Sequence, residues 1–198
     1  MAVKLNLLGN ILIVLTLIIV VKMYYESSSY QLKCITSNVD GGTYCVRDGN
    51  RIQMAADLLA ETSQKMKKLV KYMGEKYPER DNVIRLVNGF NPKKISETLP
   101  SDTLTAYSEN KGEKLAFCVK KTKDGKQLID ENTLTFVAIH ELSHIMTKSV
   151  GHGDEFWQNF KFLLINAKAN GIHEPVDYKK NPINYCDMEI HDNPYFDL

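Results

Sequence analysis

An uncharged, apolar run near the amino terminus divides this chain into two parts with different physical requirements. Residues 5–21 read LNLLGNILIVLTLIIVV and contain no charged side chain. A helix needs about 20 residues to cross a bilayer, and residues 5–25 meet that length when Lys22 extends its ammonium group to the interface. We therefore expect an amino-terminal transmembrane anchor over 1–25. A cleaved signal peptide and a buried helix of a soluble core are the alternatives.

The side of the membrane that the rest of the chain occupies is left open. The positive charges before the run slightly favour a cytoplasmic amino terminus, with the remainder translocated. The sequence has many asparagines but no Asn-x-Ser/Thr glycosylation acceptor, which points the other way.

The composition after the anchor is that of a chain that buries a core. Hydrophobic residues make up 43% and charged residues 25% of the sequence. Two of the 25 lysines and arginines flank the apolar run, so residues 26–198 carry 23 basic against 24 acidic residues, a net charge of −1. A domain that depends on phosphate contacts usually has a basic excess. Nucleic acid is therefore disfavoured as a partner.

The four cysteines do not define a disulfide scaffold or a zinc ribbon. They are Cys34, Cys45, Cys118 and Cys186, with no C-x-x-C pair among them. Cys34 and Cys45 flank the turn sequence Asp40-Gly41-Gly42, so either a hairpin disulfide or two free thiols is possible there. Pairing of Cys118 with Cys186 and the redox compartment are also left open.

Apolar residues at three-, four- and seven-residue steps predict three helices, over 51–77, 131–149 and 154–169. A proline or glycine follows each of them. The segment 26–50 reads as a linker followed by a hairpin. Residues 51–198 are then the folded domain, with an irregular carboxyl-terminal tail.

Short apolar runs predict strands over 82–87, 104–108 and 115–119. The last two flank Asn110-Lys111-Gly112, a turn sequence typical of a hairpin. Together with the helices, these strands predict an α+β fold with a small antiparallel sheet.

A possible catalytic motif, His140-Glu141-Leu142-Ser143-His144, lies within the second predicted helix of the domain. Residues four apart on a helix share a face, so both imidazoles can point at one metal ion. Glu141 can reach a water held by that metal, which is the general-base role in the H-E-x-x-H motif. Apolar neighbours predict a buried active-site helix. The alternative is a surface helix with two ordinary histidines.

A catalytic zinc ion commonly has three protein ligands and leaves the fourth position to water. We rank His152 first as the third ligand, because Gly151 and Gly153 flank it and permit a chain reversal. The remaining alternatives are two histidines of the tail and two glutamates, namely His173, His191, Glu155 and Glu174.

Two segments, Phe136–His144 (FVAIHELSH) and Gly151–Trp157 (GHGDEFW), together resemble the SprT-like and WLM groups of small gluzincin-type zinc metallopeptidases. The resemblance covers about residues 82–170. It implies a minimal zincin-like domain whose hairpin at 104–119 offers an edge strand to an extended peptide.

The same resemblance assigns a role to each motif residue. It implies that His140, His144 and His152 are zinc ligands and that Glu141 is the catalytic acid/base. An oxyanion-stabilising donor is normally also needed. Its candidates are three tyrosines and a histidine, namely Tyr107, Tyr178, Tyr185 and His173.

We therefore expect a membrane-anchored, zinc-dependent metalloendopeptidase that hydrolyses peptide or protein substrates with a zinc-activated water. The alternative from another class is a non-catalytic, membrane-tethered interaction protein with a structural metal. Glu141 argues against that alternative, because a structural site has no use for an acid beside its ligands. A secreted peptidase released from a signal peptide is a third possibility.

Overall fold

The computed structural model describes residues 7–29 and 32–197, and it divides the chain into two compact units, Met1–Gln31 and Leu32–Leu198. The first unit contains one helix, α1 (Leu7–Ser29), whose 23 residues span about 34 Å at 1.5 Å per residue. Its side chains are exposed from residue 7 to 24 apart from one half-buried position. By length and composition it can cross a membrane. Residues 5 and 6 of the predicted run lie outside the described residues.

The second unit is built on a five-stranded sheet with the order β1-β2-β3-β5-β4. Its strands are β1 (Leu32–Thr36), β2 (Thr43–Arg47), β3 (Ile95–Glu97), β4 (Ala106–Glu109) and β5 (Lys114–Phe117). β1 pairs antiparallel with β2, and β4 with β5, as expected for hairpins. The segment expected to be a linker and hairpin thus supplies two strands of the sheet.

The sheet is mixed, which corrects the prediction of an antiparallel sheet. β3 pairs in parallel with β2 on one side and with β5 on the other. Parallel strands need a long crossover connection, and the chain between β2 and β3 supplies one with two helices. This pairing joins residues about fifty positions apart, so no local sequence pattern indicates it.

Four helices accompany the sheet: α2 (Ile52–Lys76), α3 (Asp81–Gly89), α4 (Glu131–Met146) and α5 (Asp154–Ala169). The three predicted helices are confirmed, with α4 three residues shorter than expected. The predicted strand over 82–87 is wrong, because this segment forms α3. Its apolar residues fall at 83, 84, 86 and 87, which is the spacing of a helical face, and Val83 and Leu86 are buried.

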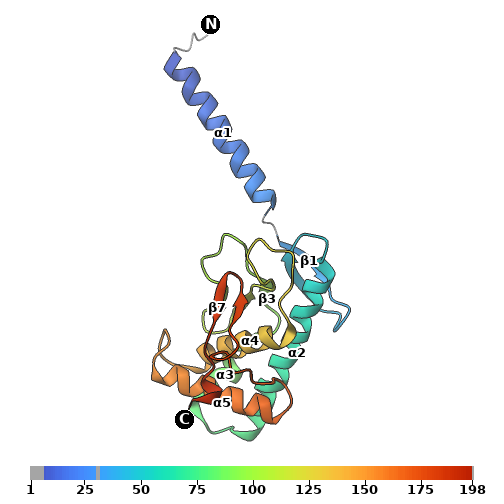
Figure 1. The fold of residues 1–198 in the computed structure, drawn as a ribbon, viewed down its shortest axis with the longest axis vertical. Helices are drawn as coiled ribbons and strands as arrows, with labels where there is room; N and C mark the ends of the chain where they lie inside the picture. Colours follow the sequence, from blue (N-terminus) through green and yellow to red (C-terminus); the bar gives the residue numbers. More distant parts are fainter. Residues whose placement is uncertain (1–6, 30–31, 198) are drawn as a thin grey trace. The chain divides into compact units, whose positions relative to one another are not determined.

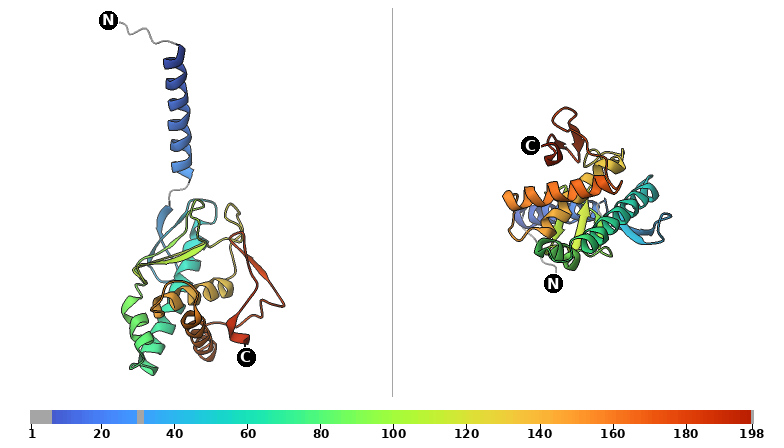
Figure 2. Two further views of the ribbon diagram at one scale, coloured as in Figure 1. Left: turned by 90° about the vertical axis from the view of Figure 1, so that its left-hand side faces the viewer. Right: turned by 90° about the horizontal axis from the view of Figure 1, so that it is seen from below.

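Helix α4 lies at the centre of the unit. It contacts α2, α3 and α5 as well as strands β4 and β5, while α2 covers β1, β2 and β3 (Figures 1 and 2). Twelve of its sixteen residues are buried. This all-round burial explains why the helix is apolar on every side rather than along one stripe.

The tail contains more regular structure than expected. It forms the hairpin β6 (Ile183–Tyr185) and β7 (Met188–Ile190), followed by the short 3-10 helix η1 (Pro194–Phe196), which packs on α5. A disulfide from Cys118 to Cys186 ties the hairpin turn to the end of β5. A second disulfide, Cys34–Cys45, joins directly paired residues of β1 and β2.

Candidate metal centre

Two of the three predicted metal ligands, His140 and His144, lie one turn apart on α4. Asp130 is the N-cap of α4, and its carboxylate accepts hydrogen bonds from the Thr133 backbone N–H (2.9 Å) and from the Thr133 hydroxyl (2.8 Å). Two turns further on, the Nε2 atoms of His140 and His144 lie 3.2 Å apart. The helical spacing therefore places both imidazoles on the face that was predicted.

His152 comes to the same point from the segment between α4 and α5. Its Nε2 atom lies 3.0 Å from Nε2 of His140, and the ligand atoms of all three histidines lie within 4.8 Å of one another. Gly151 has a φ of +88°, a conformation that favours glycine. Gly153 has a φ of −75°, which any residue can adopt. Only the first of the two glycines therefore supplies a conformation that side chains resist.

An aromatic side chain at the start of α5 packs against the whole cluster. The ring of Phe156 is fully buried, and its centroid lies 4.4 Å from that of His144, 4.6 Å from that of His152 and 4.8 Å from that of His140. The neighbouring Trp157 is 41% exposed, and its ring centroid lies 6.0 Å from that of His152. Phe156 thus restricts the orientation of all three imidazoles.

Burial keeps the helix histidines in their neutral, metal-binding form. It lowers the pKa of His140 to about 3, helped by the neighbouring His144 and His152, and it lowers the pKa of His144 to about 4. Burial also raises the pKa of the Glu141 carboxyl to about 8. Three converging imidazoles form a nitrogen donor set that suits a divalent transition metal, so the residues present fit a metal ion.

The cluster opens onto a cleft of about 510 Å³. One wall is the edge strand β4 with its following turn, and the other consists of the three histidines, Glu141 and the segment before His152. Of the four candidate oxyanion donors, only Tyr107 lines this cleft. Tyr185 is buried and donates a hydrogen bond to the Thr105 carbonyl (3.3 Å).

The structure places the alternative ligands elsewhere. Glu155 pairs with Arg85, with 3.1 Å between the carboxylate and the guanidinium. His173 and Tyr178 are buried against the ring of Phe136. The other two alternatives are exposed. Glu174 forms an ion pair with Lys168, and His191 lies beside the Glu189 carbonyl.

The prediction from sequence did not include three residues around the cluster, Arg85, Lys111 and Ser108. Lys111 and Ser108 line the cleft, and Arg85 contacts the end of α4 from α3. The sequence contained a partial signal for one of them, because Lys111 occupies the hairpin turn that was predicted.

The second unit is therefore an α+β domain with a three-histidine cluster in a cleft beside a sheet edge. No protein-family model matches the chain. Protein R325 of Acanthamoeba polyphaga mimivirus is 24% identical over 185 residues, which cover 91% of this chain and 93% of the viral protein.

Two further viral proteins are similar over shorter stretches. Protein 042R of Invertebrate iridescent virus 3 is 34% identical over 104 residues, or 52% of this chain and 58% of that protein. Protein 136R of Invertebrate iridescent virus 6 is 33% identical over 82 residues, or 41% and 44%. Among solved structures, Wss1 from Saccharomyces cerevisiae superposes with a TM-score of 0.49 and 18% identity, covering 64% of this chain and 89% of Wss1. The viral relatives have no assigned activity.

Proposed function

We propose that this protein is a membrane-anchored, zinc-dependent endopeptidase in which His140, His144 and His152 hold the metal and Glu141 is the catalytic acid/base. The convergence of the three imidazole nitrogens within 4.8 Å, beside a buried glutamate, carries the proposal. The resemblance of the two motif segments to SprT-like and WLM peptidases supports it. A structural metal site would not account for Glu141, which lines the cleft next to the cluster.

Zinc in a three-histidine site lowers the pKa of water and polarises a carbonyl oxygen. The chain supplies the proton transfers. Glu141 is 4% exposed, so its carboxyl is shielded from bulk solvent and can hold a proton taken from the attacking water. It then returns that proton to the leaving amine. Tyr107, which lines the cleft, is the proposed donor to the oxyanion.

The substrate is a peptide in extended conformation, bound along β4. This strand is at the edge of the sheet, and its partner on the inner side is β5. Its outer backbone groups are available for pairing, and residues 106–108 line the cleft that contains the histidines. Addition of a peptide strand there would carry its backbone past the proposed metal site.

Helix α1 is the proposed anchor. Its one hydroxyl between residues 11 and 21, on Thr16, donates to the Leu12 carbonyl of the same helix (2.8 Å), so it needs no partner in the lipid. The two disulfides of the second unit favour an oxidising compartment for the catalytic domain. The net charge of −1 over 26–198 disfavours nucleic acid as a partner.

The proposal is tested with the full-length protein in detergent, loaded with zinc and incubated with a mixture of unstructured peptides. The wild type is expected to cleave them, and Glu141→Gln is expected to keep its zinc and lose at least about a hundredfold in kcat, the lower range for a general base. Cleavage by Glu141→Gln at the wild-type rate would contradict the role of Glu141. Removal of zinc by a chelator is expected to abolish activity, and added zinc to restore it.

A further inference from the structure

The position of His152 depends on a segment without regular secondary structure. Residues 147–153 connect α4 to α5, and His152 lies near their end. The last carbonyls of a helix have no partner within the helix, so their contacts decide how the chain leaves it. In this structure those carbonyls are held from two sides.

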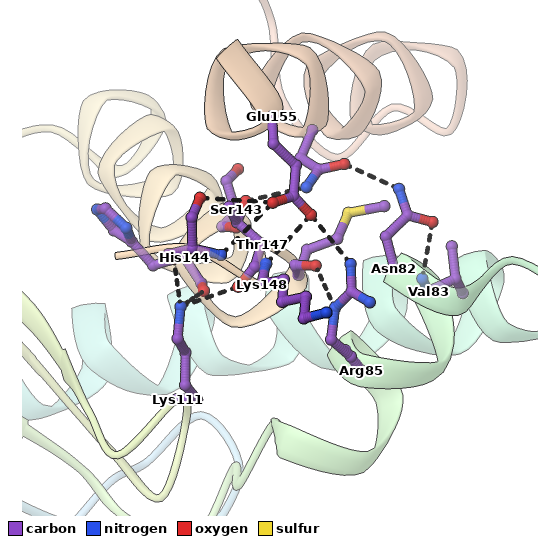
Figure 3. Close-up of polar contacts among 12 residues, drawn as sticks. Asn82, Val83, Arg85, Lys111, Ser143, His144, Thr147, Lys148 and Glu155 are labelled. Carbon is purple, nitrogen blue, oxygen red and sulfur yellow. Dashed lines mark hydrogen bonds and ion pairs between the residues drawn. The ribbon is translucent and has the colours of Figure 1, made fainter. Parts of the chain in front are cut away.

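The first contact comes from the β4–β5 hairpin. The Lys111 ammonium donates to the carbonyls of His144 (3.2 Å), Thr147 (2.8 Å) and Ser149 (2.8 Å), as Figure 3 shows for the end of α4. One cation thereby uses its three donors on three carbonyls at the negative end of the helix dipole. These carbonyls belong to the metal-binding helix and to the segment that leads to His152.

The hairpin turn is itself fixed by a close approach of two backbones. Lys111 has a φ of +56° and Gly112 a φ of +107°. A Cβ atom on Gly112 would lie 2.3 Å from the Gly89 carbonyl oxygen, and one on Gly89 would lie 2.6 Å from the Lys111 carbonyl oxygen. The turn therefore rests directly on the end of α3, which sets the position from which Lys111 reaches α4.

The second contact comes from α3 and α5. Arg85 on α3 donates from Nε to the Met146 carbonyl (3.0 Å) and pairs with Glu155 on α5 (3.1 Å). Glu155 accepts from the backbone N–H groups of Lys148 (3.1 Å) and Ser149 (3.4 Å). The end of α4 and the segment that follows it are thus bonded to the β4–β5 hairpin, α3 and α5 (Figure 3).

We propose that Lys111, with the Arg85–Glu155 pair on the opposite side, is a positioning residue that holds His152 in register with His140 and His144. This inference rests on the proposed metal site. Lys111 lines the cleft but acts on the metal only through the backbone that carries the ligands. Outer partners of metal ligands typically change metal affinity by 10- to 100-fold.

The test measures cobalt and zinc binding to the full-length protein in detergent, with zinc affinity obtained by competition against a chelator. Cobalt reports ligand geometry through its visible absorption. Lys111→Met is expected to weaken zinc binding by at least about tenfold and to change the cobalt spectrum. Lys93→Met, at an exposed position after α3, is the matched control and is expected to leave both unchanged.

A purely structural role of Lys111 predicts a different result. The folded fraction of Lys111→Met would then bind with wild-type affinity and give the wild-type spectrum, and this outcome would overturn the inference. If Lys111→Met does not fold, Arg85→Met decides, because it removes the opposite contact from a partly exposed position. Unchanged zinc affinity and cobalt spectrum in Arg85→Met would then overturn the inference. A wild type that binds neither metal would instead overturn the proposed function.

Discussion

The Nε2 atoms of His140 and His152 lie 3.0 Å apart, although twelve positions separate the two residues in the sequence. A straight helix cannot produce this proximity, because twelve residues of α-helix span about 18 Å. It arises because α4 ends at Met146 and the chain turns back before α5 begins at Asp154. The geometry of that return is therefore as important to the cluster as the helix itself.

The conformation of Gly151 provides a matched pair of substitutions. Both Gly151 and Gly153 have open space where a Cβ would lie, but only Gly151 has a positive φ. Gly151→Ser is expected to lower the free energy of unfolding by about 1–2 kcal/mol and to weaken metal binding. Gly153→Ser places a preferred residue at the N-cap of α5 and is expected to be neutral or slightly stabilising.

Chemical denaturation and zinc titration of both glycine variants check this prediction. Equal destabilisation by the two substitutions would show that the left-handed conformation at Gly151 contributes nothing. A Gly151→Ser variant with wild-type zinc affinity would show that the return of the chain does not depend on it.

The stability of the domain is expected to fall at acidic pH because of His173. Burial, with a contribution from Lys65, lowers its pKa to about 4, against about 6.5 in an unfolded chain. The folded protein therefore keeps the imidazole neutral while the unfolded chain binds a proton. The contribution of neutral His173 to the free energy of unfolding is complete above pH 6.5. It is lost as the pH falls towards 4, by about 3 kcal/mol in total.

The comparison of wild type with His173→Leu isolates this effect, because the other buried histidines titrate in both proteins. The free energy of unfolding is measured at pH 7.5, 6, 5 and 4. The wild type is expected to lose more stability than the variant over this range. Parallel curves would mean that His173 is not the group responsible.

Helix α1 is expected to tolerate charged side chains at its end but not at its centre. The full-length protein is expected to remain in the membrane pellet through alkaline carbonate extraction. Leu15→Arg with Ile18→Arg puts two charges at the centre of the helix, at a cost of about 5–7 kcal/mol, and is expected to release the protein. Leu7→Arg with Leu8→Arg puts them at the helix end, where they can reach the interface. Quantitative release of the wild type would contradict an anchor.

Local patterns were enough to predict most of the candidate site. The four-residue spacing of His140 and His144 predicted their common face, and the glycine before His152 indicated the return of the chain. Contacts between distant parts of the chain could not be predicted in this way. Lys111 reaches carbonyls 33 to 38 positions further on, and nothing in its own neighbourhood indicates those partners.

Contacts between distant parts of the chain also explain where the predicted fold differs from the structure. The segment 82–87 is short, so its apolar residues suited a strand as well as a helix when taken alone, and packing against α4 decides for the helix. The parallel pairing of β3 joins one residue pair with β2 and three with β5, at sequence separations of about 51 and 20 positions. Such pairing is determined by tertiary packing rather than by the strands themselves.

The proposed zinc site consists of His140, His144 and His152 together. It is tested most directly by the zinc affinity of single alanine variants of the full-length protein in detergent, measured by chelator competition. The wild type is expected to bind one equivalent, and His152→Ala is expected to lose orders of magnitude in affinity, as are His140→Ala and His144→Ala. His173→Ala and His191→Ala are expected to retain nearly wild-type affinity. Wild-type binding by His152→Ala, together with loss of binding by Glu155→Ala, would contradict the account.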